Sequence, residues 1–244
     1  MYGIIGGTGL SQLSCLENVT REIVRTPYGE PSGPLTCGSI GDTHVIFLAR
    51  HGYGHTIPPH QVNYRANLWA LKEKGANQVV SVASVGGIRA DLGPGKLVVP
   101  DQLLDYTWGR DHTYYQGEKP VTHIDFTHPY AENLRVRILD AAGAAGEALM
   151  NGGVYATTQG PRLETAAEIN RLERDGADMV GMTGMPEASL ARELGLDYAA
   201  IAVVVNHAAG RSDSTHGIQL DAIEAVLHES MGRVRHIIEV LVST

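Results

Sequence analysis

Short apolar runs alternate with amphipathic segments along most of the chain. The first run, residues 2–6, leads into a glycine-rich turn. Residues 34–50 hold two apolar stretches on either side of Gly41-Asp42, a pattern typical of a hairpin. Later runs have the length of buried strands. From them we expect strands at residues 78–84, 96–100, 103–107, 153–158, 178–181 and 198–205.

The segments between these strands have the apolar spacing of helices. Residues 61–74 stop at Gly75, and glycine commonly follows the last turn of a helix. The same spacing predicts helices at residues 130–143, 164–174, 186–194 and 219–240. In the last of these, apolar residues recur at helical steps and predict one packed face: Leu220, Ile223, Leu227, Met231, Val234 and Leu241. Residues 108–129 are polar and show no regular pattern.

Strands that alternate with helices predict an α/β fold, in which a mixed or parallel sheet is flanked by helices. The chain has 244 residues, of which 43% are hydrophobic and 19% charged, enough to build one sizeable core. It shows neither an internal repeat nor a linker, so we expect residues 1–244 to form a single domain.

Net charge and cysteine content limit which partners and which cellular compartment we expect for this chain. The formal net charge of −8 argues against nucleic acid or an anionic membrane surface as the main partner. No apolar run approaches the roughly 20 residues that span a bilayer. Cys15 and Cys37 are far apart and predict neither a disulfide framework nor a zinc site. We therefore expect a cytoplasmic protein.

A glycine turn follows the first predicted strand. The glycines of Gly6-Gly7-Thr8-Gly9 let the backbone approach an anion, and Thr8 adds a hydroxyl donor. The same turn could open a dinucleotide-binding fold, or need glycine only for its dihedral angles. Against the dinucleotide interpretation, no acidic residue closes a strand about 20 residues later, where ribose recognition requires one.

A second polar cluster begins with Arg50 and His51 at the end of a predicted strand. With His55 and His60 it suggests zinc, but glycines and prolines prevent the helical spacing that pairs zinc ligands. Arg50 can instead offer its planar fork to a phosphate. On this segment alone, a surface ion pair for Arg50 and a capping role for His51 are the favoured interpretation.

Polar residues also follow several later strands. They are Ala83-Ser84, residues 157–164, Met182-Thr183 and Asn206-His207. Ligands of open α/β sheets bind outside the carboxyl ends of strands, so these residues predict a shared pocket. Glu164 has a structural alternative, because a carboxylate in the first turn of a helix is favoured by the helix dipole. Asn206 follows an apolar run and therefore needs a partner in a partly dry place.

Together these residues resemble the trimeric purine nucleoside phosphorylase and methylthioadenosine phosphorylase family. The resemblance covers most of the chain, in GIIGGTGL, RHGxxHxxxPxxVNYxAN, GGIRADLGPGKLVVPDQ, QGPRLETAAE and GMTGMPEASLARELGL. It implies the nucleoside phosphorylase fold and reversible phosphorolysis of a purine nucleoside, in which phosphate attacks the anomeric carbon and the base leaves. It also implies inorganic phosphate as co-substrate, with no metal and no organic cofactor.

The resemblance carries roles onto individual residues. It implies a phosphate site of Thr8, Arg50, His51, Ser84 and Thr183, with Met182 along the ribose. It implies catalytic roles for Asn206 at the base and His51 at the phosphate. Ala83 departs from the pattern, because the family usually has Asn or Thr there, and removes one hydrogen bond on the phosphate side.

Two branches of the family meet in this chain. Asn206 and Glu164 match members that act on 6-oxopurines. By the same resemblance, adenine-specific members carry an Asp-x-Asp pair where this chain has Asn206-His207-Ala208. His123 matches the methylthioadenosine branch, in which a histidine reaches the sugar from a neighbouring subunit. Leu220 and Ile223 match the apolar 5′ pocket of that branch. The combination predicts S-methyl-5′-thioinosine as the substrate.

Other functions stay open at this stage. A methylthioadenosine phosphorylase is the nearest alternative, followed by a general 6-oxopurine nucleoside phosphorylase. From other classes, the glycine turn alone allows a dinucleotide-binding reductase, and a noncatalytic nucleotide-binding module is also conceivable. The resemblance further implies a homotrimer or a dimer of trimers.

Overall fold

The computed structural model describes residues 1–117 and 120–244. Its strands are β1 (Tyr2–Gly6), β2 (Glu17–Glu22), β3 (Leu35–Ile40), β4 (Thr43–Ala49), β5 (Gln78–Gly87), β6 (Leu97–Val99), β7 (Gln102–Asp105), β8 (Leu149–Asn151), β9 (Val154–Thr157), β10 (Met179–Gly181) and β11 (Asp197–His207). Its helices are α1 (Tyr64–Glu73), α2 (Glu132–Ala144), α3 (Ala166–Arg174), α4 (Gly184–Glu193) and α5 (Leu220–Ser243), with short 3-10 helices η1 (Pro59–Gln61) and η2 (Ser212–His216). The strands join one mixed sheet flanked by helices, which confirms the predicted α/β class.

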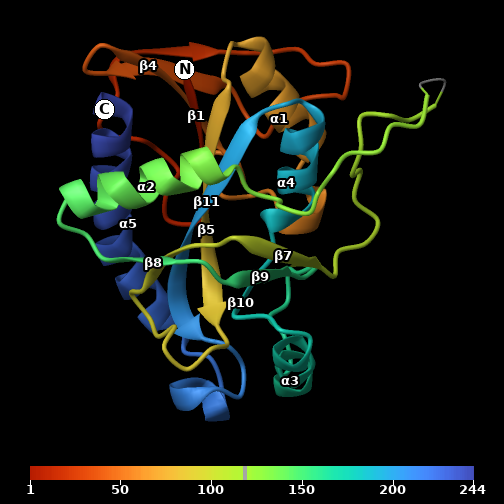
Figure 1. Ribbon diagram of the computed structural model, residues 1–244, viewed down its shortest axis with the longest axis vertical. Coiled ribbons are helices and arrows are strands. Elements are labelled where there is room, and N and C mark those ends of the chain that lie inside the picture. Colours follow the sequence, from red (N-terminus) through yellow and green to blue (C-terminus); the bar gives the residue numbers. More distant parts are fainter. Residues whose placement is uncertain (118–119) are drawn as a thin grey trace.

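Strand β5 is the centre of this sheet and the place where it divides. Along its whole length β5 pairs in parallel with β11, its neighbour in Figure 1. On its other side, β1 pairs with residues 78–81 and β10 pairs with residues 86–87. Residues 82–85 therefore have a strand partner on one side only, and the sheet opens next to them.

Helices cover both faces of the central strands. In Figure 1, α2 and α5 lie on one side of β5 and β11, and α1 and α4 lie on the other. Successive side chains of a strand point to opposite faces, so Ile4 of β1 packs in the core beneath α2 and α5, whereas Ile5 packs beneath α1 and α4. Strands buried on both faces are apolar throughout, which explains the uninterrupted apolar runs of β1 and β11.

Two strands were not predicted. β2 has the sequence ENVTRE and is exposed along most of its length, so it lacks the apolar alternation by which a strand is recognised. It pairs only with β3 at the edge of the sheet, where polar side chains are favoured. β8 has only the residues Leu149–Asn151, which is too short for a pattern.

The start of α3 differs from the prediction in a way that matters for the site. The helix begins at Ala166, two positions after residue 164. The Thr165 hydroxyl accepts a hydrogen bond from the Glu168 backbone N–H, and the Glu168 carboxylate accepts one from the Thr165 N–H, which together form a capping box. Glu164 therefore lies outside the helix. The interpretation of Glu164 as a first-turn carboxylate is wrong, and Glu168 takes that place.

The end of β11 also differs. The strand continues to His207, so Asn206 lies within it and not after it. The pairing register with β5 shifts between Val204 and Asn206, where Asn206 pairs with Gly86. Such a bulge changes the direction in which a side chain points.

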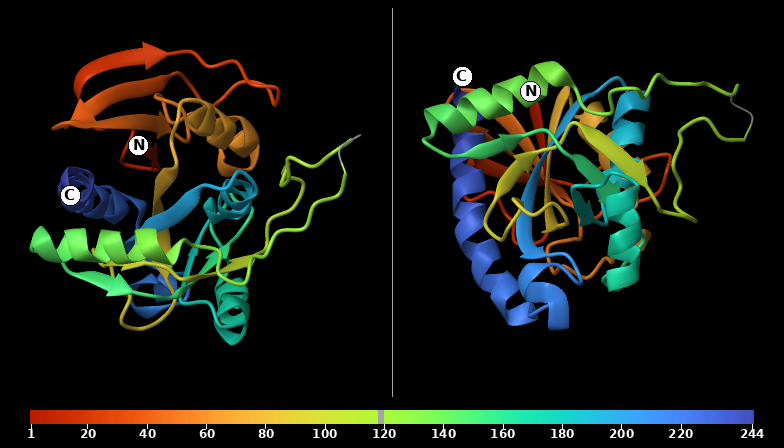
Figure 2. Two further views of the ribbon diagram at one scale, coloured as in Figure 1. Left: turned by 45° about the horizontal axis from the view of Figure 1, so that its top comes forward. Right: turned by 60° about the horizontal axis from the view of Figure 1, so that its bottom comes forward.

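The polar segment 108–129 has no helix or strand in its described residues, as predicted. Its yellow-green trace projects from the sheet in both views of Figure 2. Residues 118 and 119 lie outside the described residues.

Candidate active site

A cavity of about 760 Å³ opens where the sheet divides beside β5. Its wall includes residues 83–86 of β5, Gly7-Thr8 after β1, Arg50-His51 after β4, residues 180–183 around the end of β10, and Asn206 of β11. The sequence had predicted this shared pocket. The rule that ligands bind outside the carboxyl ends of parallel strands explains only part of this pocket, because β10 runs antiparallel to β5. The end of β10 reaches the cavity because it replaces β1 as the partner of β5.

The five residues predicted to bind phosphate all line this cavity: Thr8, Arg50, His51, Ser84 and Thr183. Ala83 lines it as well. The glycine turn is needed for close packing here, because a Cβ on Gly7 would come within 2.5 Å of the Val82 carbonyl oxygen and 2.9 Å of Arg50 Nη1. The turn therefore brings the Gly7 backbone against the Arg50 guanidinium.

Arg50 is fully buried and its planar fork is occupied. Nε and Nη2 donate to the two carboxylate oxygens of Glu187 at 2.7 and 2.8 Å. Nη2 also donates to Ser81 Oγ at 2.6 Å, and Nη1 donates to the Val82 carbonyl at 2.9 Å. The fork therefore faces the Glu187 carboxylate, and the alternative of a surface ion pair is wrong because both side chains are buried. Phosphate binding by Arg50 stays a prediction. A guanidinium has five N–H bonds, so one Nη1 N–H remains without an acceptor among the described residues.

His51 is a neutral imidazole at pH 7. Burial, and then the charge of Arg50, lower its pKa to about 4. Nδ1 lies 2.8 Å from the Ile57 carbonyl oxygen, which can only accept, so Nδ1 carries the proton. Nε2 is then an acceptor. The His51 and His55 rings are in contact at a tilt of 49°, with centroids 4.7 Å apart, and both line the cavity.

The low pKa of His51 predicts that the protein loses stability in mild acid. Below about pH 6.5 the unfolded histidine takes up a proton that the folded one refuses until about pH 4. The unfolded state then binds more protons, so the free energy of unfolding falls as the pH falls through this window. Between pH 7 and pH 5 we expect wild type to lose about 2 kcal/mol more than His51→Gln in urea denaturation. Equal losses would show that His51 titrates normally.

Two polar side chains predicted to bind the base, Glu164 and Asn206, also line the cavity. The Thr158 hydroxyl donates to Glu164 Oε1 at 2.5 Å, which leaves the other carboxylate oxygen for a ligand. Asn206 Nδ2 donates to the His207 carbonyl at 2.6 Å, so one amide N–H and the amide oxygen remain. Glu164 is the one carboxylate among the described residues of this wall.

Apolar side chains also line the cavity. Met182, Ile218, Leu220 and Ile223 line the cavity. Leu220 is 66% exposed, whereas Ile223 packs against the core and Leu227 is the first buried residue of α5. His123, predicted to serve a neighbouring subunit, is exposed and does not line the cavity of its own chain.

The sequence analysis missed two polar residues that hold this wall in place, Glu187 and Arg110, and it included Thr158 only within residues 157–164. Arg110 is buried and donates from Nη1 to the Met182 carbonyl at 2.9 Å and from Nη2 to the Gln159 carbonyl at 2.9 Å. It thereby ties together the two loops that carry Thr183 and Glu164. Its sequence neighbours are polar and irregular, so no local pattern marks it.

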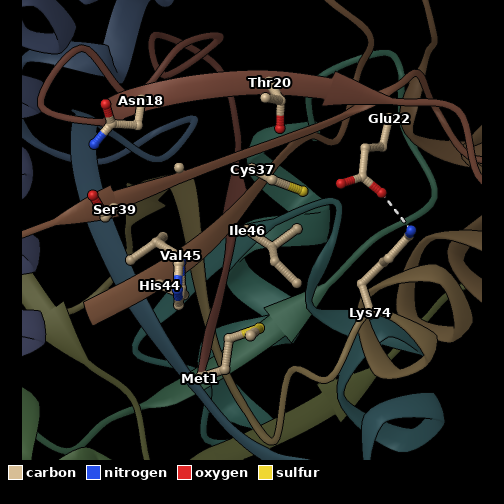
Figure 3. Close-up of a pocket in the computed structure, with 11 residues that line it drawn as sticks. Met1, Asn18, Thr20, Glu22, Cys37, Ser39, His44, Val45, Ile46 and Lys74 are labelled. Atoms are coloured by element: carbon tan, nitrogen blue, oxygen red, sulfur yellow. Dashed lines mark ion pairs between the residues drawn. The ribbon is translucent and has the colours of Figure 1, made fainter. Parts of the chain in front are cut away.

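A second cavity, of about 390 Å³, lies beside β2, β3 and β4 near the start of β1 (Figure 3). Lys74 forms an ion pair there with Glu22. Burial raises the pKa of the Cys37 thiol, which keeps it protonated at neutral pH. This cavity lies at the amino end of β1, opposite the edge where ligands of such sheets bind. The first cavity is therefore the candidate active site.

Across the described residues, no three His, Cys, Asp or Glu side chains come together as a metal site. Among the helices of residues 1–117 and 120–244, none is both long and apolar enough to cross a membrane.

Comparison with known proteins places these observations in a family. Residues 1–243 match the family described as the phosphorylase superfamily. A probable S-methyl-5′-thioinosine phosphorylase of Pseudomonas syringae pv. tomato is 56% identical over 237 residues, which are 96% of this chain and 95% of that protein. The 6-oxopurine nucleoside phosphorylase of Pyrococcus furiosus is 47% identical over 215 residues, which are 86% of this chain and 80% of that protein.

Solved structures show the same fold. Methylthioadenosine phosphorylase from Schistosoma mansoni in complex with adenine superposes with a TM-score of 0.95 at 35% identity, covering 99% of this chain and 90% of that one. This similarity confirms the predicted fold type.

Proposed function

The chain belongs to the phosphorylase superfamily, and we propose that it converts S-methyl-5′-thioinosine and phosphate to hypoxanthine and 5-methylthioribose 1-phosphate. It is a nucleoside phosphorylase and hence a pentosyltransferase. One observation carries the choice of substrate: a single cavity is lined both by Glu164 and Asn206 and by Leu220 and Ile223. The first pair suits a 6-oxopurine, and the second suits an apolar 5′ group.

Where phosphate binds, we propose that the cavity supplies hydrogen-bond donors and no protein nucleophile. A phosphate oxygen forms a bond to the anomeric carbon while the glycosidic C–N bond breaks and its electron pair passes to the base. The sugar carries positive charge between the two, so the phosphate must be held close by. We assign this task to the hydroxyls of Thr8, Ser84 and Thr183 and to the remaining Nη1 N–H of Arg50.

His51 complements these donors. Because Nδ1 donates to the Ile57 carbonyl, Nε2 can accept a hydrogen bond from the O–H of a hydrogen phosphate. This arrangement needs neither a metal nor an organic cofactor, and we propose that the reaction uses none.

The base end favours a leaving 6-oxopurine. Negative charge builds on the base as the bond breaks, and N7 takes up a proton from solvent, which balances the proton that hydrogen phosphate releases when it forms the sugar phosphate. Asn206 can accept from N7 with its amide oxygen and donate to the 6-oxo group with its free N–H. Glu164, held by Thr158, can accept from N1–H of hypoxanthine, an atom that in adenine has only a lone pair.

Steady-state turnover tests this proposal against its rivals. Methylthioinosine, methylthioadenosine and inosine are each supplied with and without phosphate, and base release is followed. We expect phosphate-dependent release of hypoxanthine, fastest from methylthioinosine. A preference for methylthioadenosine would support the adenine-specific alternative, and equal use of inosine would support a general 6-oxopurine enzyme. Turnover that needs a nicotinamide cofactor would support a reductase.

We expect the 5′ pocket to favour methylthioinosine over inosine by about tenfold to several hundredfold. A methylthio group gains free energy from burial against Leu220 and Ile223, whereas a 5′ hydroxyl loses its water without finding a partner. Leu220→Ser should reduce this preference, measured as the ratio of kcat/KM for the two substrates. Val136→Ser, at an exposed position outside this wall, is the control. An unchanged ratio in Leu220→Ser would place the 5′ group elsewhere.

We also propose a trimer, in which His123 of one subunit reaches the sugar bound to the next. His123 is exposed on the projecting segment and does not line the cavity of its own chain. A monomer would then lack a complete site, so specific activity should fall as the enzyme is diluted through its dissociation range. Sizing by light scattering at the same concentrations gives the assembly state. A fully active monomer would rule out the shared site. Location in the cytoplasm stays a prediction.

A further inference from the structure

Glu187 is a buried carboxylate that the reaction just described does not use. It lies in α4, and its side chain is 1% exposed. Four hydrogen bonds reach it: two from Arg50, one from Ser81 Oγ at 2.6 Å and one from Tyr198 OH at 2.8 Å. Burial alone would raise the pKa of Glu187, but the Arg50 charge and these hydrogen bonds bring it below its ordinary value. Glu187 is therefore an anion whose two oxygens both accept hydrogen bonds, three at Oε1 and one at Oε2.

These partners lie one layer behind the cavity. Arg50 lines the wall, whereas Glu187, Ser81 and Tyr198 do not. Each of them comes from a different element: β5 carries Ser81, α4 carries Glu187 and β11 carries Tyr198. The carboxylate thus fastens Arg50 to three parts of the core, and it cannot touch the substrate.

The geometry fixes which part of Arg50 can meet an anion. Glu187 and Ser81 take the Nε and Nη2 donors, and the Val82 carbonyl takes one Nη1 N–H. The remaining N–H belongs to Nη1, which is the guanidinium nitrogen next to Gly7. Gly7 also lines the cavity. An arginine without this carboxylate would be a buried, uncompensated charge and could not keep one orientation.

We propose that Glu187 is a positioning residue for phosphate, which acts by holding Arg50 so that a single Nη1 N–H is directed at the bound anion. This role rests on the proposed function, because it requires Arg50 to bind phosphate. The Tyr198 and Ser81 hydroxyls contribute to this role, because their hydrogen bonds hold the Glu187 carboxylate in place.

Two tyrosines offer a matched test. Tyr198 and Tyr130 are both buried, and their rings stack 6.0 Å apart. Tyr198 donates to Glu187, whereas the Tyr130 hydroxyl has no hydrogen-bond partner among the described residues. Tyr198→Phe therefore loosens Glu187 without removing the ion pair, and Tyr130→Phe removes a hydroxyl from the same stack without touching Glu187.

The experiment measures KM for phosphate and for nucleoside, together with direct calorimetric binding of inorganic phosphate. We expect Tyr198→Phe to raise the phosphate KM and the phosphate dissociation constant about threefold to tenfold, with the nucleoside KM within twofold of wild type. Glu187→Gln should raise both phosphate constants further, and Tyr130→Phe should leave them unchanged.

The outcomes separate this inference from the proposed function. If Tyr198→Phe and Glu187→Gln lower the melting temperature but leave phosphate affinity within twofold of wild type, Glu187 is only structural and the inference is wrong. If Tyr130→Phe weakens phosphate binding as much as Tyr198→Phe does, packing of the stack is the cause, and the inference again fails. If wild type binds phosphate but releases no base from any purine nucleoside, the proposed function fails, and the calorimetric constants still decide the role of Glu187.

Discussion

Replacing Asn206 by Asp is expected to lower the preference for methylthioinosine over methylthioadenosine by at least about 100-fold. In wild type we expect methylthioadenosine to be rejected by about 10³ or more, because a mismatched base leaves buried polar groups unpaired. Adenine presents two donors where hypoxanthine presents a donor and an acceptor. A carboxylate accepts from both, whereas the amide of Asn206 would face a second donor.

The hydrogen bonds around Asn206 limit how complete this change can be. Its amide donates to the His207 carbonyl at 2.6 Å, and Ser214 Oγ donates to the same oxygen at 2.7 Å. An aspartate has no proton to donate there and would set an anion against a carbonyl oxygen. We therefore expect methylthioinosine turnover to collapse while methylthioadenosine turnover rises only modestly.

Values of kcat/KM for both substrates check this prediction. Asn206→Ala is the control, since it removes donor and acceptor together and should slow both substrates. If Asn206→Asp scales both substrates down equally, or if wild type already prefers methylthioadenosine, then Asn206 does not select the base and the adenine-specific alternative replaces our proposal.

Much of the cavity wall could be predicted from sequence because its residues occupy local positions that a pattern can mark. Thr8, Arg50 and Ser84 each lie within or directly after an apolar strand, and the resemblance to a known family assigned them a common ligand. The structure brings all of them to one cavity. Their roles toward phosphate are predictions that the experiments above test.

The orientation of Arg50 could not be predicted, because its partner is far away in the chain. Glu187 is 137 residues later and lies in a segment with helical spacing, where a glutamate usually faces solvent. Burial of both side chains is a property of how α4 packs against β5 and β11. Local sequence patterns contain no information about that packing, so the fork was expected to face the ligand.

The contact between Thr158 and Glu164 is another feature that the sequence could not predict. The predicted helix started at residue 164, which made Glu164 a plausible dipole partner. The capping box at Thr165 moves the start of α3 and frees Glu164 to accept from Thr158 at 2.5 Å. A boundary error of two residues therefore changed the interpretation of a site residue.

We expect the Arg50–Glu187 pair to contribute more to phosphate binding than to the stability of the fold. Arg50→Met leaves a buried, unpaired carboxylate, and Glu187→Leu leaves a buried, unpaired guanidinium. Breaking a buried ion pair in this way costs about 3–5 kcal/mol of unfolding free energy. Each single variant should therefore be strongly destabilised.

The double variant, Arg50→Met with Glu187→Leu, should recover most of this loss. Replacement of a whole buried pair by apolar side chains is often neutral, although here the Ser81 and Tyr198 hydroxyls lose their acceptor. We therefore expect the double variant to lie within about 1–3 kcal/mol of wild type, because each unsatisfied hydroxyl costs part of that amount. Urea denaturation of the four proteins measures the coupling between the two sites.

Activity should not recover with stability. The double variant lacks the Nη1 N–H that we assign to phosphate, and a lost hydrogen bond to a charged group costs about 1.5–3 kcal/mol, or roughly 10-fold to 150-fold in phosphate affinity. The phosphate constant, measured by calorimetry on the folded double variant, checks this. A stable double variant that binds phosphate as wild type does would show that Arg50 is not a phosphate ligand. A double variant as unstable as the two single variants would show instead that the pair is required for folding, since its removal then creates a defect that apolar side chains cannot fill.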